Sequence, residues 1–331
     1  MKKLLVTGGA GFIGGNFIQY ILKHYPHYKI YNLDALTYAG DLTKHRHIEH
    51  NPHYTFIQAN IIDYEMILSL FLQHQFDYVI HFAAESHVDR SIQDPSIFVK
   101  TNVVGTQNLL EAARQVGIKK FIHVSTDEVY GELDFDPTTF FTEETPLKPN
   151  SPYSASKASS DLLVQAYHHT YGLPINITRC SNNYGPYHFP EKLIPLTICQ
   201  VLNDKRVPVY GDGQNIRDWL HVFDHCAAID LILHEGVDGE VYNIGGRNER
   251  TNLQVVKAII QALGKSEELI EFVEDRLGHD KRYAINPSKI EQLGWKPKFT
   301  FESGIDQTIK WYVENKVWIE EVKNRNKAYF I

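Results

Sequence analysis

The sequence predicts an α/β fold in which a mainly parallel sheet is covered by helices on both faces. Two observations support this prediction. Short apolar segments alternate with segments of helical periodicity through the first half of the chain, and a glycine-rich turn joins the first such pair. Successive parallel strands need crossover connections, and helices that provide them bury both faces of the sheet. With 331 residues, the chain can form one large domain or two ordinary ones.

Each expected strand is a short apolar run bounded by turn residues. In chain order, the strands are expected at 3–7, 29–34, 54–59, 76–84, 119–126 and 173–180. The intervening helices have apolar residues three or four positions apart, and are expected at 12–25, 64–74, 101–117 and 151–172. Ser151 is suited to cap the last helix, while Gly117 and Gly172 are suited to end helices.

Beyond about residue 185 this alternation is lost, and proline and glycine interrupt the chain. We expect a smaller lobe of mixed structure there, built from roughly 185–220 and 245–331. The segment near 221–244 is expected to return to the first domain. The expected division is therefore 1–184 for the first domain and mainly 185–331 for the second lobe.

Composition narrows the class of protein. Hydrophobic residues make up 43% and charged residues 22%, as in soluble globular proteins. The formal net charge of -7 disfavours nucleic acid as a partner. The apolar run after Lys2 and Lys3 is too short for a signal peptide, and no run approaches the ~20 residues of a membrane span. We expect a cytoplasmic protein that binds neither membranes nor nucleic acid.

Cysteine and histidine patterns suggest no metal site. The three cysteines are far apart in sequence and favour buried, reduced thiols. His221 and His225 are four residues apart, but Asp224 is expected to cap a helix between them, so the two need not share a face. No H-E-x-x-H motif or cysteine cluster is present.

The first turn carries the pattern of a dinucleotide-binding loop. Gly8, Gly11 and Gly14 form G-x-x-G-x-x-G between an expected strand and an expected helix. Such glycines let the backbone approach a pyrophosphate at a helix N-terminus. Asp34 lies twenty residues later at the end of the second strand, where a carboxylate accepts hydrogen bonds from an adenosine ribose. With no Arg or Lys at 34–39 to receive a 2′-phosphate, NAD is predicted rather than NADP, in a Rossmann-type doubly wound domain.

Tyr153 and Lys157 are four residues apart on an expected helix, so their side chains share one face. We expect the cation to lower the pKa of the phenol from ~10 toward the working range. The phenolate could then take a proton from a sugar hydroxyl while hydride leaves the same carbon for nicotinamide. Tyr-x-x-x-Lys pairs are common on solvated helices, so this interpretation depends on the glycine loop upstream.

Together these features resemble the extended short-chain dehydrogenase/reductase family. The resemblance is carried by the glycine loop, Asp34, the strand end at Thr126 and the Tyr153–Lys157 pair, and it covers essentially the whole chain. It implies a Rossmann domain followed by a smaller mixed α/β lobe that binds a nucleotide sugar. Family members commonly form homodimers through helices near 101–117 and 151–172, which is expected here as well.

Within that family, the adjacent acids Asp127 and Glu128 are similar to those of the nucleotide-sugar 4,6-dehydratases. Further segments that resemble the 4,6-dehydratases are 81–92, 151–161, 180–196, 216–225, 242–246 and 278–285. The resemblance implies dTDP-glucose as substrate, in a route to deoxysugars such as rhamnose. C4 is oxidised with NAD, water is eliminated across C5 and C6, and hydride returns to C6. By resemblance Glu128 is the base at C5 and Asp127 the acid at C6, which requires Asp127 to be protonated at neutral pH.

The resemblance also implies three sets of site residues. The expected catalytic residues are Thr126, Asp127, Glu128, Tyr153 and Lys157. The expected cofactor residues are Gly8, Gly11, Phe12, Ile13, Gly14, Asp34, Asn60, Ile61, Ala83, Ala84, Thr101, Tyr153, Lys157 and Asn183. The expected substrate residues are Ser86, Thr126, Asn182, Lys192, Leu193, Pro208, Tyr210, Arg217, Asn252, Asp280 and Tyr283.

Three positions depart from the family pattern: Gly15 replaces a common Ser, Leu277 a common Pro, and Asn286 a common Asp. Leu277 leaves the base preference of the nucleotide site open. The alternatives are a 4,6-dehydratase for a UDP-, CDP- or GDP-sugar, an epimerase or decarboxylase, and a catalytically silent NAD-binding scaffold. The adjacent acids argue against an epimerase or decarboxylase, and the complete catalytic set argues against a scaffold.

Overall fold

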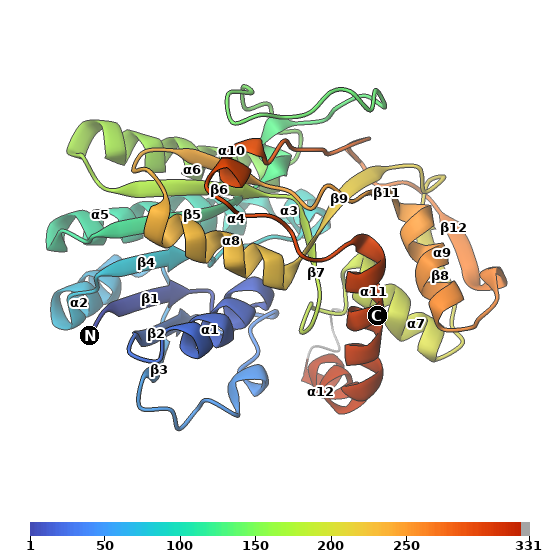
Figure 1. Ribbon diagram of the computed structural model, residues 1–331, viewed down its shortest axis with the longest axis horizontal. Helices are drawn as coiled ribbons and strands as arrows, with labels where there is room; N and C mark the ends of the chain where they lie inside the picture. The colour runs from blue at the N-terminus through green and yellow to red at the C-terminus, as the bar shows by residue number, and fades with distance from the viewer. Residues whose placement is uncertain (326–331) are drawn as a thin grey trace.

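The computed structural model describes residues 1–325 and is built on a seven-stranded parallel sheet (Figure 1). The strand order is β10-β6-β5-β4-β1-β2-β3. The strands are β1 (Lys3–Thr7), β2 (Lys29–Asp34), β3 (Tyr54–Gln58), β4 (Tyr78–His81), β5 (Lys120–Thr126), β6 (Ile175–Cys180) and β10 (Val241–Ile244). The order reverses beside β1, so the loops after β1 and β4 diverge and leave a crevice at their carboxyl ends. The predicted α/β fold class is confirmed.

Helices cover both faces of this sheet, as the apolar strands require. One face is covered by α1 (Phe12–His24) and α8 (Val222–Glu235), and the other by α2 (Tyr64–His74), α5 (Thr106–Val116) and α6 (Pro152–Tyr171) (Figure 1). Each face has its own apolar core: Phe17 and Ile229 lie in one, and Phe71 and Leu110 in the other.

The helix ends follow the predicted signals with one exception. Ser151 caps α6 by accepting a hydrogen bond from the backbone N–H of Ser154 at 3.0 Å. Gly117 and Gly172 end α5 and α6 with φ of 69° and 67°. The exception is α8, which begins directly after His221, whose ring accepts from the N–H of Phe223. The expectation that Asp224 caps this helix is therefore wrong, because Asp224 already lies in its first turn.

Two expected elements differ in extent because tertiary contacts outweigh local pattern. The strand expected at 76–84 is only β4, since the backbone at Ala83 leaves the sheet to pack against Gly8; a Cβ on Gly8 would lie 2.6 Å from the nitrogen of Ala83. The helix expected at 101–117 begins as a π-helical segment at Val99–Gly105, where Asn102 hydrogen-bonds both backbone groups of Glu85. π-Helical turns often occur at functional sites.

The rest of the chain forms a mixed lobe beside the carboxyl edge of the sheet (Figure 1). Its strands are β7 (Asn182–Tyr184), β9 (Ile216–His221) and β11 (Glu249–Thr251) in one sheet, and β8 (Val207–Tyr210) and β12 (Ile270–Val273) in another. Its helices are α7 (Leu193–Leu202), α9 (Asn252–Ala262), α11 (Phe301–Glu314) and α12 (Lys316–Arg325). The short helix α10 (Ser288–Gln292) instead packs beside β10 of the large sheet, where Ile290 joins the core around α8 (Figure 1).

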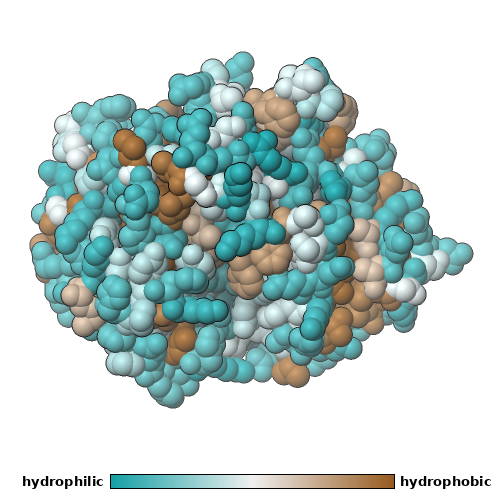
Figure 2. Space-filling model, in the orientation of Figure 1, coloured by the Kyte–Doolittle hydropathy of each residue, from teal (hydrophilic) through white to brown (hydrophobic). Residues whose placement is uncertain are grey.

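The remaining short helices lie in the connections. They are η1 (Thr43–His45), α3 (Val88–Gln93), α4 (Pro95–Phe98), η3 (Asp127–Tyr130) and η4 (Glu267–Leu269). Hydrophobic residues are scattered among hydrophilic ones on the face in Figure 2. Within residues 1–325, no helix is both long and apolar enough to cross a membrane.

Candidate active site

A cavity of about 420 Å³ lies at the carboxyl ends of the central strands, between the sheet and the lobe. All fourteen expected cofactor residues line it, although they come from loops, strand ends and helices spread over residues 8–183. The catalytic candidates Thr126, Asp127 and Glu128 line it as well. The structure therefore brings the expected cofactor and catalytic residues together in one cavity.

The glycine loop forms the floor of this cavity and leaves no room for side chains. A Cβ on Gly14 would lie 2.5 Å from the carbonyl oxygen of Gly8, and Gly8 itself has a φ of 70°. Both positions therefore require glycine. The N-terminus of α1 follows at Phe12, so its free N–H groups face the cavity, as a pyrophosphate requires.

Asp34 lies at the end of β2 beside the glycine loop. Its carboxylate accepts hydrogen bonds from the N–H groups of Ala10, at 2.9 Å, and Leu36, at 2.8 Å. Burial raises the pKa of Asp34, while these hydrogen bonds and the charge of Lys44 lower it. The carboxylate is fixed and lines the cavity, where it fits the hydroxyls of an adenosine ribose.

Tyr153 and Lys157 project from the first two turns of α6 into the opposite side of the cavity. The ammonium of Lys157 donates to the carbonyl of Val124 at 2.9 Å, and burial lowers its pKa to about 8. Burial raises the pKa of Tyr153 well above that of a free phenol, and the charge of Glu128 raises it further. We expected Lys157 to lower the pKa of Tyr153 below that of a free phenol. This expectation is wrong, because the pKa of Tyr153 is raised.

The acid pair lies where β5 ends and the short helix η3 begins. Thr126 caps this helix, and its hydroxyl accepts from the N–H of Glu128 at 3.3 Å. Asp127 is only 2% exposed, and no described residue lies within hydrogen-bond distance of its Oδ2. Burial raises its pKa well above the usual value, and the charges of Glu128 and Asp218 raise it further. The buried environment therefore favours the protonated form of Asp127, which is the form that the proposed acid requires.

Glu128 differs from its neighbour because cations surround it. Burial raises the pKa of Glu128 overall, and the charges of Arg276, Arg217 and Lys192 oppose that rise. The pKa of Asp127 is raised more strongly, because Arg217 is the only cation that opposes its burial among the main causes. The two environments therefore favour a proton on Asp127 more than on Glu128. Such a split is typical of an acid paired with a base.

Some of the expected substrate residues line the cavity, and the others lie outside its lining. Ser86, Asn182, Lys192 and Leu193 line the cavity with Thr126. Arg217, Asp280 and Tyr283 form a cluster beside Glu128: the guanidinium of Arg217 donates to the carbonyl of Asp280 at 2.9 Å and lies 4.3 Å from the ring centroid of Tyr283. Tyr210 contacts His279 edge-on across the lobe. For Pro208 on β8 and Asn252 at the start of α9, a place beside substrate stays a prediction.

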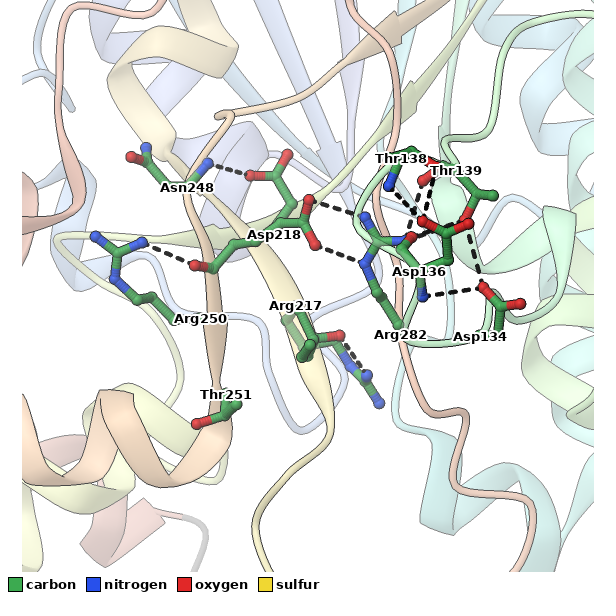
Figure 3. A network of polar contacts seen from close by, with 12 residues as sticks. Asp134, Asp136, Thr138, Thr139, Arg217, Asp218, Asn248, Arg250, Thr251 and Arg282 are labelled. Carbon is green, nitrogen blue, oxygen red and sulfur yellow. Dashed lines mark hydrogen bonds and ion pairs between the residues drawn. The ribbon is translucent and has the colours of Figure 1, made fainter.

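A buried arginine holds this cluster in place. Arg282, 1% exposed, donates two hydrogen bonds to the carboxylate of Glu249 and one each to the carbonyls of Asp136 and Thr139 (Figure 3). It thereby joins the strand pair β9–β11 to the loop that follows the acid pair. Asp280 and Tyr283 flank Arg282 in the chain, so their positions depend on the same network.

Sequence reasoning missed several residues of the site. Arg276 acts on Glu128 but lies just outside the segment whose pattern was matched. Glu85, His188 and Glu191 line the cavity from loops without periodic structure. They fall within the matching segments 81–92 and 180–196, but nothing in those segments marks them as cavity residues, because their positions depend on how separate loops meet. Within the described part of the chain, no cluster of potential ligands could hold a metal ion.

Known proteins show the same architecture. Residues 5–308 match the family model described as GDP-mannose 4,6 dehydratase. A dTDP-glucose 4,6-dehydratase from Xanthomonas campestris pv. campestris is 53% identical, with 97% of this chain and 96% of the relative covered. The crystal structure of dTDP-glucose 4,6-dehydratase from Bacillus anthracis in complex with NAD has 51% identity and a TM-score of 0.91, covering 98% of this chain and 100% of that one. The Streptomyces venezuelae enzyme of the same name, also solved with NAD, has 47% identity and a TM-score of 0.93, covering 97% and 100%.

Proposed function

The chain belongs to the dTDP-glucose 4,6-dehydratase family, and from this premise we propose how its residues divide the work of the reaction. The enzyme is an NAD-dependent hydro-lyase that dehydrates dTDP-glucose to dTDP-4-dehydro-6-deoxy-glucose. One observation carries the assignment of roles: a buried neutral acid, Asp127, and a cation-facing carboxylate, Glu128, share a cavity with the glycine loop and the Tyr153–Lys157 pair.

The cavity fits NAD. The glycine loop and the N-terminus of α1 hold the pyrophosphate, and Asp34 holds the adenosine ribose. Asn60, Ala83 and Thr101 line the remaining walls beside Asn183. When bound, NAD would supply the chemistry of hydride transfer, taking hydride from C4 and giving it back at C6.

Tyr153 takes the proton of the C4 hydroxyl. Its phenol lies within the hydrogen-bonding range of Thr126, which lowers its pKa against the effect of burial. Thr126 in turn orients the C4 oxygen. Lys157, fixed on the carbonyl of Val124, would position the nicotinamide ribose.

Glu128 and Asp127 then perform the elimination. Oxidation at C4 acidifies the proton on C5, which Glu128 removes. Asp127 donates its proton to the departing C6 hydroxyl, so water leaves and a C5–C6 double bond remains. Since Asp127 is 2% exposed, bulk water cannot easily take its proton before the sugar does. Hydride return to C6 and a proton at C5 complete the product.

The nucleotide end of the substrate is placed by cations. Lys192, Arg217 and Arg276 converge near Glu128, and a planar guanidinium can make paired hydrogen bonds to a diphosphate. Ser86 and Asn182 are placed to contact the sugar. Tyr210, Asp280 and Tyr283, with Pro208 and Asn252, belong to the nucleoside side in this proposal.

Three wider features are proposed with this function. Residues 1–184 with 221–244 form the NAD domain, and the rest of 185–331 forms the nucleotide-sugar lobe. The enzyme acts in the cytoplasm. It forms a homodimer through α6 and through α5 with the π-helical segment before it. The exposed apolar side chains of Val99 and Val104 in that segment and of Leu162 on α6 support this; they are 51%, 41% and 58% exposed.

The test is turnover with matched substrates. The protein is incubated separately with dTDP-, UDP-, CDP- and GDP-linked sugars. The 4-keto-6-deoxy product of each incubation is measured. The proposal expects efficient turnover with dTDP-glucose and slow turnover with the others. Preferential turnover of another nucleotide sugar would contradict the substrate, and epimerised product in place of dehydrated product would contradict the roles of Asp127 and Glu128.

A further inference from the structure

Lys44 is a buried cation close to the glycine loop that none of the roles above uses. It lies in the short helix η1 and is 2% exposed. Its ammonium donates to the carbonyls of Ala10 and Gly11, at 2.9 and 2.8 Å. Burying an ammonium is costly unless it is paired, so a lysine in this position needs a compensating role.

The absence of a side chain at Gly15 makes room for Lys44. A Cβ on Gly15 would lie 2.5 Å from the Cδ of Lys44, in the middle of a buried side chain that has little room to move. Gly15 is one of the three positions that depart from the family pattern. The departure and the buried lysine therefore belong to one feature of this chain.

Carboxylates on two segments face the ammonium. Asp41 is held by Trp318, at 2.7 Å, and by Arg325, at 2.7 Å, both from α12. Burial raises the pKa of Asp41, but hydrogen bonds from Thr43 and Arg325 lower it to about 2 overall. Asp41 is therefore ionised and favours the charged form of Lys44.

Asp34 is the second carboxylate. Its carboxylate accepts a hydrogen bond from the N–H of Ala10, and the ammonium of Lys44 donates one to the carbonyl of the same residue. The two side chains therefore hold both backbone groups of Ala10. The charge of Lys44 also lowers the pKa of Asp34 against burial. The lysine thus acts on both the pyrophosphate loop and the ribose-binding carboxylate.

We propose that Lys44 is a cofactor-positioning residue, whose buried ammonium fixes the glycine loop from behind and places a positive charge under the pyrophosphate of NAD. This inference rests on the NAD site proposed above. The ammonium of Lys44 donates its two hydrogen bonds to carbonyls of the glycine loop. Lys44 is therefore not assigned to a ribose 2′-phosphate, and the predicted preference for NAD over NADP is unchanged.

The charge of Lys44 is also sensitive to pH. Burial lowers its pKa to about 8, with Asp41 and Asp34 opposing and Arg325 assisting. His45 and His188 also lie near it, and burial lowers their pKa values to about 4 and about 3, so both are neutral when Lys44 titrates. Loss of the ammonium proton should therefore weaken NAD binding as the pH rises through about 8.

The experiment compares Lys44→Met with Lys23→Met, the same change at an exposed position of α1. Binding of NAD, ADP and adenosine to the full-length protein is measured by titration, with thermal unfolding followed in parallel. Lys44→Met should weaken NAD and ADP about tenfold, equivalent to ~1.4 kcal/mol, and adenosine about twofold or less. Lys23→Met should change none of them.

Two results would overturn the inference: unchanged NAD binding in Lys44→Met, or equal losses for ADP and adenosine. Should Lys44→Met fail to fold, Lys44→Gln keeps a donor without the charge and is subject to the same criteria. The NAD affinity of the wild-type protein should fall above about pH 8, and Lys44→Met should not show this fall. An identical fall in both proteins would also contradict the role of Lys44. Failure of the wild-type protein to bind NAD would instead contradict the proposed function.

Discussion

Replacing Asp127 by Asn removes a proton donor from the cavity while keeping its shape. The side chain is buried, and no described residue hydrogen-bonds to its Oδ2, so few hydrogen bonds change. A positioned general acid contributes about 10²–10⁴-fold, or roughly 3–5 kcal/mol of transition-state stabilisation. Overall turnover of dTDP-glucose should fall by that factor. Oxidation at C4, which depends on Tyr153 and Thr126, should continue.

The assay follows both steps. Enzyme-bound NADH is monitored by its near-ultraviolet absorbance after mixing with substrate, and the 4-keto-6-deoxy product is measured separately. Asp127→Asn should accumulate NADH and form product slowly. Asp306→Asn, at an exposed position of α11, serves as the matched control and should behave as wild type. If Asp127→Asn bound substrate normally but formed no NADH, or if its turnover were unchanged, the assignment of Asp127 as the acid at C6 would be refuted.

Further variants test other parts of the account. Tyr153→Phe should suppress C4 oxidation itself, so no NADH appears on mixing, and normal NADH formation would contradict its role. Since Arg276 lowers the pKa of Glu128, and Glu128 must be ionised to act, Arg276→Met should move the acidic limb of the kcat/KM profile to higher pH; an unmoved limb would argue against it. Arg282→Lys should cost about 1–3 kcal/mol of stability by leaving buried acceptors unpaired, and raise KM for dTDP-glucose more than it lowers kcat, whereas a fall in kcat alone would contradict this. Leu162→Asp should shift the protein from dimer to monomer in sedimentation experiments, and an unchanged dimer would place the interface elsewhere.

Local pattern was sufficient for much of the fold and for the cofactor cavity. The strands β1 and β2 and the helix α2 have the predicted bounds, because each is a short apolar or periodic run ended by clear turn signals. The glycine loop and Asp34 also lie where predicted. These features depend on neighbours in the sequence, which is what periodicity and motif spacing report.

Other features depend on contacts between distant segments. Lys44 lies in a polar stretch that resembles a solvated surface, and its burial depends on Gly15 and on Asp41 held by α12. The early end of β4 depends on the approach of Ala83 to the glycine loop. The lowered pKa expected for Tyr153 was wrong, because burial and the charge of Glu128 raise it. None of these outcomes is encoded within a few residues of the position concerned.

The central claim is that one active site oxidises C4, eliminates water and reduces C6 without releasing the hydride. It is tested most directly with dTDP-glucose carrying deuterium at C4, with the product analysed by NMR. The account predicts a 4-keto-6-deoxy sugar with the deuterium at C6 and a solvent-derived hydrogen at C5. A product without deuterium at C6, or recovery of only the substrate and its C4 epimer, would contradict it.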